Sequence, residues 1–351
     1  MYTSGTTGEY KGALLSNGNL TSEIISFCQE LLIGEKTIII LPLYHILGLT
    51  ISLLCSLYSG ATIYISEGNE MFLHEIKSFQ PDNLVLVPIL VKKIYDEILM
   101  EVEKSGLGRI LKYSKMRNNL WKITSRKKLQ NISHKLLGNE LKYIVTGGAP
   151  INPQLCYFFR RNKIELLNGY GATECSAAVS VNRMYDNRVG SVGKILKCND
   201  VMVDNVDGNG VGEIFVKGTN VIESYDQDST GFEYGYFRTG DIGKVEDGYL
   251  YITGRSKNMI LLGNGQNVFP EELETKIKKI DYVDEVVVME EDDKVKAEIY
   301  IKDEARRHLI YADINKMNST LPVYKRIRSI EVRDNEFPKT KTGKIKRVVR
   351  G

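Results

Sequence analysis

Short apolar segments with strand character alternate with longer amphipathic segments through the first two-thirds of this chain. The strand candidates cover residues 38–41, 62–65, 84–87, 143–145 and 165–167. The helix candidates cover residues 21–32, 72–78, 90–104 and 153–161. Alternation of short strands with helices in this way indicates α/β layers.

One stretch of this region, residues 37–65, contains no Asp, Glu, Lys or Arg and is long enough to cross a bilayer. Pro42 and Gly48 interrupt it, and Ser59-Gly60 adds a turn signal further on. We interpret the stretch as a buried strand at 38–41, a buried helix at 47–57 and another strand at 61–65. No transmembrane helix is expected.

The remainder of the chain shows two further patterns of predicted secondary structure. Short β segments between Gly and Asp turns indicate a small β-rich subdomain, with strands at 201–203, 212–217, 240–245 and 249–252. A mixed pattern follows, with helices at 270–279 and 312–319 and strands at 283–289, 296–301 and 328–332. Because 351 residues are too many for one ordinary core, we expect a large domain at 1–254 and a small α+β domain at 255–351.

Composition argues against several classes of protein. The 47 basic and 44 acidic residues nearly balance, so the charge gives no sign of a nucleic-acid partner. The five cysteines are scattered without a Cys-x-x-Cys pair, which argues against a zinc site or a disulfide framework. The chain also opens without the basic and apolar regions of a secretory signal peptide. A cytoplasmic protein is therefore expected.

Two loops of a type that suits polyphosphate stand near the ends of the chain. The first runs from Tyr2 to Gly8 and is followed by Lys11, and the second runs from Pro338 to Lys344. Glycine lets backbone N–H groups approach a phosphate, hydroxyls donate hydrogen bonds and lysine supplies charge. The first loop is not a Walker P-loop, because no Gly-Lys-Ser/Thr follows at the required spacing. Three further motifs lie between the loops, at 170–174, 237–241 and 254–257.

This ordered series of five motifs resembles the adenylate-forming superfamily, which includes acyl-CoA synthetases, luciferases and the adenylation domains of peptide synthetases. The resemblance extends from Tyr2 to Arg347. It implies the adenylate-forming fold, with a large domain of α/β layers plus a β-rich subdomain and a small α+β lid domain. Full-length members carry a further large portion before the first loop, so the resemblance implies that this chain is truncated at its N-terminus.

The resemblance places the β- and γ-phosphates of ATP in the first loop. The residues that it implies there are Thr3, Ser4, Gly5, Thr6, Thr7, Gly8 and Lys11. Tyr10 departs from the family, in which a proline usually precedes the lysine. Tyrosine leaves φ free, so this loop is expected to be less rigid than in the family.

An adenine pocket is implied at two turns that each follow a strand candidate. Its residues are Gly147, Gly148 and Ala149 in the first turn and Asn168, Gly169, Tyr170 and Gly171 in the second. The glycine pair would let a flat base lie against the backbone while Tyr170 stacks on it, although a plain strand-to-helix turn is the alternative. Thr173 and Glu174 would then face the α-phosphate. A carboxylate among phosphates suits a magnesium ligand, so Glu174 is the metal candidate, with a helix-capping acid as the alternative.

Four further residues are implied by the resemblance. Asp241 would accept hydrogen bonds from both ribose hydroxyls, against the alternative of a turn aspartate. Arg255 would reach the ribose or the α-phosphate, and Lys257 occupies the hinge position of the lid. His45 would lie beside the substrate carboxylate and acyl pocket, against the alternative of a satisfied core histidine.

The second loop and the lid supply the last candidates. Lys344 resembles the family lysine that contacts the substrate carboxylate and the α-phosphate, where a positioned ammonium stabilises charge that develops during attack on phosphorus. A solvated surface lysine is the alternative. Residues 263–267, with Gly265 at the centre, would shape a tunnel for the thiol after the lid rotates.

A basic segment precedes the first adenine turn. Residues 104–139 contain many lysines and arginines and no acidic side chain. Either they form a solvated helical face, or they contact an anionic membrane surface or an acidic partner. The basic side chains make peripheral membrane contact the alternative to a purely cytoplasmic location. The segment is also similar to an insertion in long-chain fatty acyl-CoA synthetases.

Together these features predict an ATP- and Mg²⁺-dependent long-chain-fatty-acid–CoA ligase of the AMP-forming type. The acid and ATP would give acyl-AMP and pyrophosphate, and coenzyme A would then displace AMP. One alternative is an adenylation domain that loads an acyl carrier protein. Another is an inactive fragment that only binds nucleotide. Acyl chain length and oligomeric state stay open.

Overall fold

The computed structural model describes residues 1–4, 10–31, 33–105, 119–226, 231–263, 266–339, 345 and 347. Its internal contacts divide the chain into two compact units. Unit 1 comprises Met1–Met202, Phe215–Thr239 and Val245–Tyr251, and unit 2 comprises Val203–Ile214, Gly240–Lys244 and Ile252–Gly351. Both interruptions of unit 1 fall in the expected β-rich region. A domain boundary at residues 254–255 stays our proposal.

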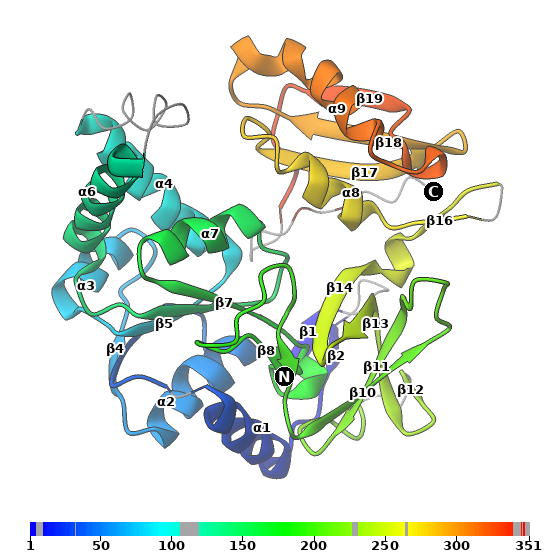
Figure 1. The fold of residues 1–351 in the computed structure, drawn as a ribbon. Coiled ribbons are helices and arrows are strands. Elements are labelled where there is room, and N and C mark those ends of the chain that lie inside the picture. Colours follow the sequence, from blue (N-terminus) through cyan, green and yellow to red (C-terminus); the bar gives the residue numbers. More distant parts are fainter. Residues whose placement is uncertain are drawn as a thin grey trace. The chain divides into compact units, whose positions relative to one another are not determined.

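A parallel sheet forms the centre of unit 1 (Figure 1). In spatial order its strands are β4 (Thr62–Ile65), β3 (Lys36–Ile39), β5 (Asn83–Leu86), β6 (Tyr143–Thr146) and β7 (Glu165–Tyr170). Every residue of β5 and β6 is buried, as is typical of parallel strands that are covered on both faces. The carboxyl ends of β6 and β7 are adjacent, with Thr146 paired to Asn168.

Helices cover this sheet on two sides. In Figure 1, α1 (Asn17–Glu30) and α2 (Cys55–Tyr58) lie on one side and α7 (Pro153–Arg161) lies on the other. Right-handed crossovers explain this arrangement, because the chain moves from β3 to β4 in one direction and then back past β3 to β5 in the other. Three more helices of unit 1 are α3 (Phe72–Phe79), α4 (Pro88–Lys104) and α6 (Asn119–Leu137). α6 packs against both α3 and α4.

Ser16 begins α1 with a reciprocal cap. Its hydroxyl oxygen accepts a hydrogen bond from the Asn19 backbone N–H at 3.0 Å, and the Asn19 side-chain oxygen accepts one from the Ser16 N–H at 3.0 Å. Caps of this kind satisfy amide groups that have no partner within the helix. The cap also fixes the Asn19 side chain, which reaches a distant segment described below.

Antiparallel strands extend the sheet beyond β7. β8 (Ser180–Val181) pairs with β7, β9 (Lys194–Ile195) pairs with β8, and Tyr249 of β14 (Tyr249–Arg255) pairs with Lys194. The other strands of the β-rich region are β10 (Asn199–Asp204), β11 (Gly212–Gly218), β12 (Phe232–Glu233) and β13 (Tyr236–Glu246).

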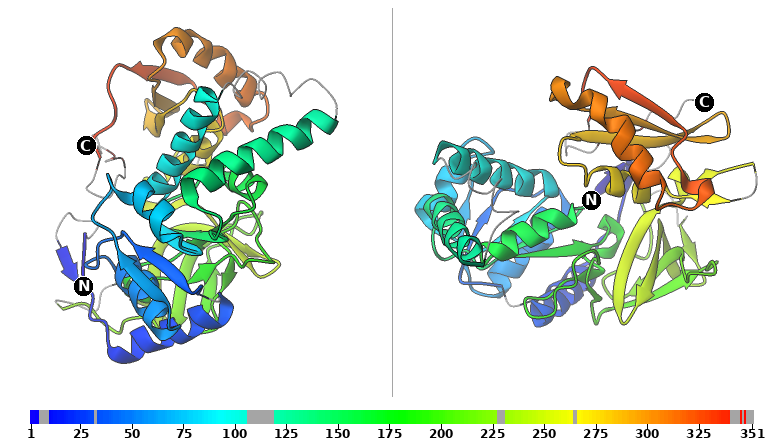
Figure 2. Two further views of the ribbon diagram at one scale, coloured as in Figure 1. Left: turned by 90° about the vertical axis from the view of Figure 1, so that its left-hand side faces the viewer. Right: turned by 45° about the horizontal axis from the view of Figure 1, so that its top comes forward.

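Unit 2 contains a three-stranded sheet (Figure 2). This unit has its own apolar core. β17 (Glu285–Glu291) and β18 (Lys294–Tyr300) are antiparallel, and β18 and β19 (Ser329–Arg333) are parallel. The helices α8 (Pro270–Ile277) and α9 (Ile310–Asn318) contribute Leu273, Ile277, Ile310 and Ile314 to that core. A small hairpin, β15 (Ile260–Leu261) and β16 (Asn267–Val268), precedes them.

The expected combination of α/β layers, a β-rich region and an α+β unit is confirmed. One element differs in type: the helix expected at 47–57 begins as the π-helix η1 (Leu47–Leu54) and continues as α2. Hydrophobicity predicts burial of this segment but does not distinguish α from π hydrogen bonding. In the part of the chain that the structure describes, no helix combines the length and low charge that a membrane span needs.

Residues 119–137 of the basic segment form α6. Leu129, Ser133 and Leu137 are buried, whereas Lys127 and Lys128 are exposed. This spacing places the apolar face of the helix inward and the lysines outward, as the interpretation of a solvated helical face predicts.

Candidate active site

The first loop lies between two short antiparallel strands, β1 (Tyr2–Ser4) and β2 (Tyr10–Gly12). Thr3 and Lys11 are directly opposite each other in this pairing. The backbones of Met1 and Ala13 continue it, with the Ala13 N–H donating to the Met1 carbonyl at 2.7 Å. The candidates Gly5, Thr6, Thr7 and Gly8 lie outside the described residues.

A segment more than 200 residues further along the chain pairs with the second strand of this hairpin. The Gly12 N–H donates to Asp226 Oδ1 at 3.0 Å, and the Asp226 N–H donates to the Gly12 carbonyl at 2.8 Å. A Cβ on Gly12 would lie 2.5 Å from Asp226 Oδ2, so a side chain at this position would displace the carboxylate. Glycine at this position thus leaves room for the Asp226 carboxylate to accept from the Gly12 N–H.

Tyr225 connects the first loop with the Thr-Glu motif. Its hydroxyl donates to Glu174 Oε1 at 2.7 Å, and Lys11 Nζ lies 5.5 Å from the centre of its ring. Cation–π contact and a hydrogen bond thus place one aromatic side chain between a lysine and a carboxylate from separate motifs. Sequence reasoning missed Tyr225, because it lies outside every glycine-rich motif and only an isolated aromatic residue marks it.

The two segments predicted to bind adenine lie side by side at the carboxyl ends of β6 and β7, the position at which open α/β sheets bind ligands. A Cβ on Gly147 would lie 3.2 Å from the Gly169 carbonyl, and one on Gly169 would lie 3.1 Å from the Ser180 carbonyl. Gly148 has φ +80°, which L side chains rarely adopt. Ala149 follows β6 and Gly171 follows β7, but Asn168, Gly169 and Tyr170 are the last three residues of β7 itself. The expectation of a second turn there is wrong, because these residues pair with β6 and β8.

Thr173 and Glu174 lie in η2 (Thr173–Cys175), a short 3₁₀ turn that follows β7. The chain then doubles back through Ser176 and Ala177, at φ +55° and +130°. The Glu174 carbonyl accepts a hydrogen bond from the Ile222 N–H at 2.9 Å. Both the backbone and the side chain of Glu174 are thus held by the segment that contains Tyr225.

Glu174 fits a magnesium ion held partly by substrate. Across the described ranges, no group of three or more His, Cys, Asp or Glu side chains is placed to hold a metal by itself. Mg²⁺ in phosphate-transfer sites usually takes one or two carboxylates together with phosphate oxygens and water. A single half-buried carboxylate, linked through Tyr225 to Lys11, suits a site of this second kind.

His45 occupies a sharp turn before η1. Its side chain is exposed, so the alternative of a core histidine is wrong. The His45 Nδ1 atom accepts a hydrogen bond from the Leu47 backbone N–H at 3.3 Å. The His45 backbone N–H donates to the Pro42 carbonyl at 3.0 Å. A Cβ on Gly48 would lie 2.4 Å from that carbonyl, so the turn requires glycine.

Unit 2 brings Asp241 and Arg255 together. Arg255 Nε lies 2.8 Å from Asp241 Oδ1, and the Asp241 side chain is only 7% exposed. Ser256 supports the same corner by donating to the Gly240 carbonyl at 3.1 Å. Lys257 follows in the short helix η3 (Ser256–Asn258). The predicted ribose carboxylate is therefore paired with the arginine that was predicted to act beside it.

Lys344 and Gly265 lie outside the described residues. The chain on either side of the second loop is described: Lys339 pairs with Ile345 in an antiparallel bridge. Arg347 then lies 2.6 Å from Glu274 and donates to the Val288 carbonyl at 3.0 Å. These contacts tie the C-terminal end of the loop to unit 2.

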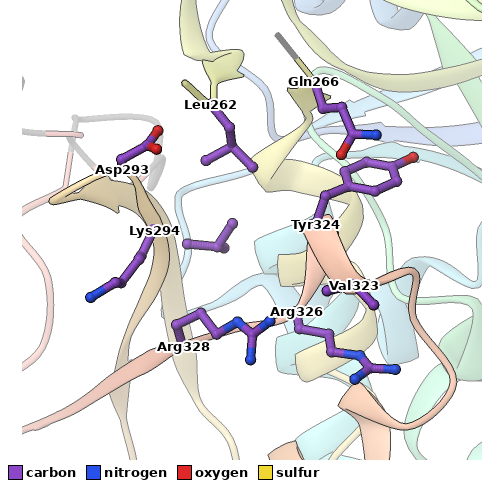
Figure 3. A pocket seen from close by; sticks show the side chains of 9 residues that line it. Leu262, Gln266, Asp293, Lys294, Val323, Tyr324, Arg326 and Arg328 are labelled. Atoms are coloured by element: carbon purple, nitrogen blue, oxygen red, sulfur yellow. The ribbon is translucent and has the colours of Figure 1, made fainter. Parts of the chain in front are cut away.

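Unit 2 also contains a cavity of about 360 Å³ between the β15–β16 hairpin and the start of β19 (Figure 3). Its lining includes Gln266 from the predicted thiol segment together with Tyr324, Arg326 and Arg328. Of the other predicted site residues that the structure describes, none lines it.

Comparison with known proteins agrees with these observations. Residues 1–226 match the family described as "AMP-binding enzyme". The chain is 31% identical over 314 residues to "Long-chain-fatty-acid--CoA ligase FadD15" of Mycobacterium bovis, which covers 82% of this chain and 51% of that protein. It is 31% identical over 307 residues to "Long-chain-fatty-acid--CoA ligase 6" of Mus musculus, which covers 78% of this chain and 43% of that protein. The chain thus spans about half the length of the curated relatives it matches.

A solved structure shows the same fold. The O-succinylbenzoate coenzyme A synthetase of Bacillus subtilis, in complex with ATP and magnesium, superimposes with a TM-score of 0.77 at 24% identity. The match covers 98% of this chain and 68% of that one. From the family match and the identity to these relatives, the chain belongs to the AMP-binding, or adenylate-forming, enzyme family.

Proposed function

We propose that this protein is an ATP-dependent acid–CoA ligase of the AMP-forming type that acts on long-chain fatty acids. The observation that carries the proposal is the position of Tyr225, which contacts both Glu174 and Lys11. These two residues belong to the motifs assigned to the phosphates of ATP. The names of the relatives, which are long-chain-fatty-acid–CoA ligases, support the acyl class and coenzyme A as the acceptor.

In the first half-reaction, a carboxylate oxygen of the acid attacks the α-phosphorus of ATP, and the bond from this phosphorus to pyrophosphate breaks. Thr3 and Lys11 bind the departing phosphates in this scheme, and Thr173 contacts the α-phosphate. Lys344 stabilises the negative charge that develops around the phosphorus. Asp241 and Arg255 hold the ribose, and the two adenine segments hold the base.

In the second half-reaction, the coenzyme A thiol loses its proton to solvent water and its sulfur attacks the acyl carbonyl carbon. The bond from this carbon to the AMP oxygen breaks, which gives the thioester and AMP.

A magnesium ion bound at Glu174 would neutralise phosphate charge during the first half-reaction. Lys257 lies at the proposed hinge, about which the lid would rotate between the two steps.

Pyrophosphate release tests this function. The protein is incubated with ATP, Mg²⁺ and acids from acetate to palmitate, with and without coenzyme A. Release that depends on a long-chain acid, with acyl-CoA formed when coenzyme A is added, is the expected result. Acylation of a phosphopantetheinyl carrier protein but not of coenzyme A would favour the carrier-loading alternative. ATP binding without acid-dependent release would contradict the proposed activity for this chain.

Asp241→Asn is expected to weaken ATP binding by about tenfold to a hundredfold, because an amide accepts fewer hydrogen bonds from the two ribose hydroxyls than a carboxylate does. Titration calorimetry with ATP measures this loss. Asp334→Asn is the matched control, since Asp334 pairs with Arg307 at 3.0 Å but is 87% exposed. Unchanged ATP affinity in a folded Asp241→Asn protein would remove Asp241 from the ribose site.

The basic helix α6 supports a smaller proposal, that the protein contacts anionic membranes peripherally. Lys127, Lys128 and Lys135 are exposed and would lie near lipid phosphates. Sedimentation with vesicles containing phosphatidylserine, compared with neutral vesicles, tests this contact. Equal sedimentation with both vesicle types would contradict it.

A further inference from the structure

The turn that follows β7 has a backbone that local sequence alone would not hold. Ser176 and Ala177 both have positive φ, a conformation that residues with side chains rarely adopt. The turn closes so tightly that a Cβ on Gly171 would lie 2.0 Å from the Ala177 carbonyl. Such a backbone persists only when surrounding contacts hold it, and this turn carries Thr173 and Glu174.

A carboxyl group from α1 lies directly behind this turn. Glu23 is fully buried, and its Oε1 accepts a hydrogen bond from the Ala178 N–H at 3.0 Å. Its Oε2 accepts one from Asn220 Nδ2 at 2.8 Å. The same Asn220 nitrogen lies 3.1 Å from the Cys175 carbonyl and 3.2 Å from the Ala178 carbonyl. Glu23 therefore contacts the turn both directly and through Asn220.

The segment around Asn220 holds the opposite side of the turn. The Ser176 hydroxyl donates to the Asn220 carbonyl at 2.6 Å. Helix α1 fixes this segment a second time, because Asn19 Nδ2 donates to the carbonyls of Thr219 and Val221 at 3.0 and 2.9 Å. Tyr225 lies a few residues further on and holds the Glu174 side chain. Helix α1 thus contacts both the turn that carries Glu174 and the segment that leads to Tyr225.

We propose that Glu23 is a positioning residue for Thr173 and Glu174: by holding Ala178 and Asn220 it keeps the turn in the conformation that presents both side chains to ATP. This inference rests on the proposed function. It concerns a residue that touches no substrate and lies outside all five sequence motifs. Any large apolar side chain could fill a general packing role, whereas this role requires a carboxyl group that hydrogen-bonds with both Ala178 and Asn220.

The electrostatics of Glu23 supply an independent readout. Burial raises the pKa of Glu23 from its ordinary 4.5 to about 8, against the opposing hydrogen bonds from Asn220 and Ala178. The titratable groups that face it are thiols, those of Cys28, Cys55 and Cys198. The folded state holds the Glu23 proton more tightly than the unfolded chain does, so protonation of Glu23 contributes to the free energy of unfolding. This contribution is complete below pH 4.5. It is lost as the pH rises to about 8.

The test compares Glu23→Gln and Glu23→Leu with wild type in the full chain. Glu75→Leu is the matched control, because Glu75 is also buried in unit 1 but accepts from the Glu67 N–H at 2.8 Å, in another loop. Hydrogen exchange of peptides covering 173–178 and 219–225 is measured first, since it requires no activity. Glu23→Leu is expected to speed exchange there about tenfold or more, Glu23→Gln less, and Glu75→Leu not at all.

Pyrophosphate release is then measured for the same proteins. Glu23→Leu is expected to lower kcat about tenfold to a hundredfold, with KM for ATP changed less, and Glu23→Gln to restore part of kcat. The pH dependence of Tm between pH 5 and 8 should be smaller in Glu23→Gln than in wild type. The inference would be overturned if Glu23→Leu left the exchange rates of both peptides at their wild-type values. It would also be overturned if Glu75→Leu raised those rates as much as Glu23→Leu does. Faster exchange with unchanged kinetics in an active chain would also overturn it, whereas a wild-type chain without release contradicts only the proposed function.

Discussion

Lys344→Ala is expected to slow formation of the acyl-adenylate by about a hundredfold to a thousandfold while sparing the thioester step. Removing a positioned ammonium from the attacked phosphorus loses stabilisation of charge that exists only in the first transition state. Single-turnover assays measure the two half-reactions separately: pyrophosphate release from acid and ATP, and thioester formation from supplied acyl-AMP and coenzyme A. Lys344→Arg should restore little, because a planar guanidinium does not replace a compact ammonium.

Lys302→Ala provides the control for charge. Lys302 is an exposed lysine of unit 2, and its loss changes the net charge by the same amount. Both half-reactions should be unaffected in this variant. Equal loss of both half-reactions in Lys344→Ala would contradict the role assigned to Lys344, since a lysine needed only during adenylation cannot slow the reaction of acyl-AMP already supplied.

Glu174→Gln is expected to lower pyrophosphate release by about a hundredfold and to raise the magnesium concentration needed for half-maximal rate. Glutamine has nearly the same shape and still offers an oxygen to the Tyr225 hydroxyl, so the turn should keep its conformation. Only the negative charge is lost. Titration of the initial rate with Mg²⁺ at fixed ATP and acid measures the effect.

Two variants separate the charge of Glu174 from its packing. Tyr225→Phe removes the 2.7 Å hydrogen bond but keeps the carboxylate and the ring beside Lys11, so it should cost less than Glu174→Gln. Glu165→Gln alters a carboxylate at the start of β7 that pairs with Arg160 at 3.1 Å, and it should leave the magnesium dependence unchanged. A wild-type magnesium response in Glu174→Gln would exclude Glu174 as a metal ligand.

Much of the fold could be predicted because hydrophobic periodicity is a local property. The strand expected at 62–65 and the helix expected at 153–161 have those bounds in the structure, and the order of α/β layers, β-rich region and α+β unit is confirmed. The segment at 47–57 shows the limit of this reasoning. Its apolar run predicts a buried helix, but the choice between π and α hydrogen bonding depends on how Leu47–Leu54 packs.

The site divides in the same way. Glycines that allow close backbone approach, hydroxyls, and a carboxylate beside them form recognisable local patterns, and the family resemblance that these patterns carry predicted Gly147, Thr173 and Glu174 as site residues. The structure added packing reasons for the glycines, such as the approach of Gly147 to the Gly169 carbonyl. The sequence motifs also predicted that Asp241 and Arg255 both act near the ribose of ATP. In the structure these two side chains form an ion pair.

The sequence by itself determined the family, the layered fold and the positions of the phosphate, adenine and ribose candidates, because each depends on residues close together in the chain. Only the tertiary structure decided how the Glu174 carboxylate is held. Glu23 and Asn220 are 197 residues apart and meet behind the same turn only after α1 and the β-rich region have packed. A buried polar side chain must find its partners within the folded core, since no water remains there to satisfy it. That requirement selects Glu23, Asn220 and Tyr225 by their position in space, which no local pattern records.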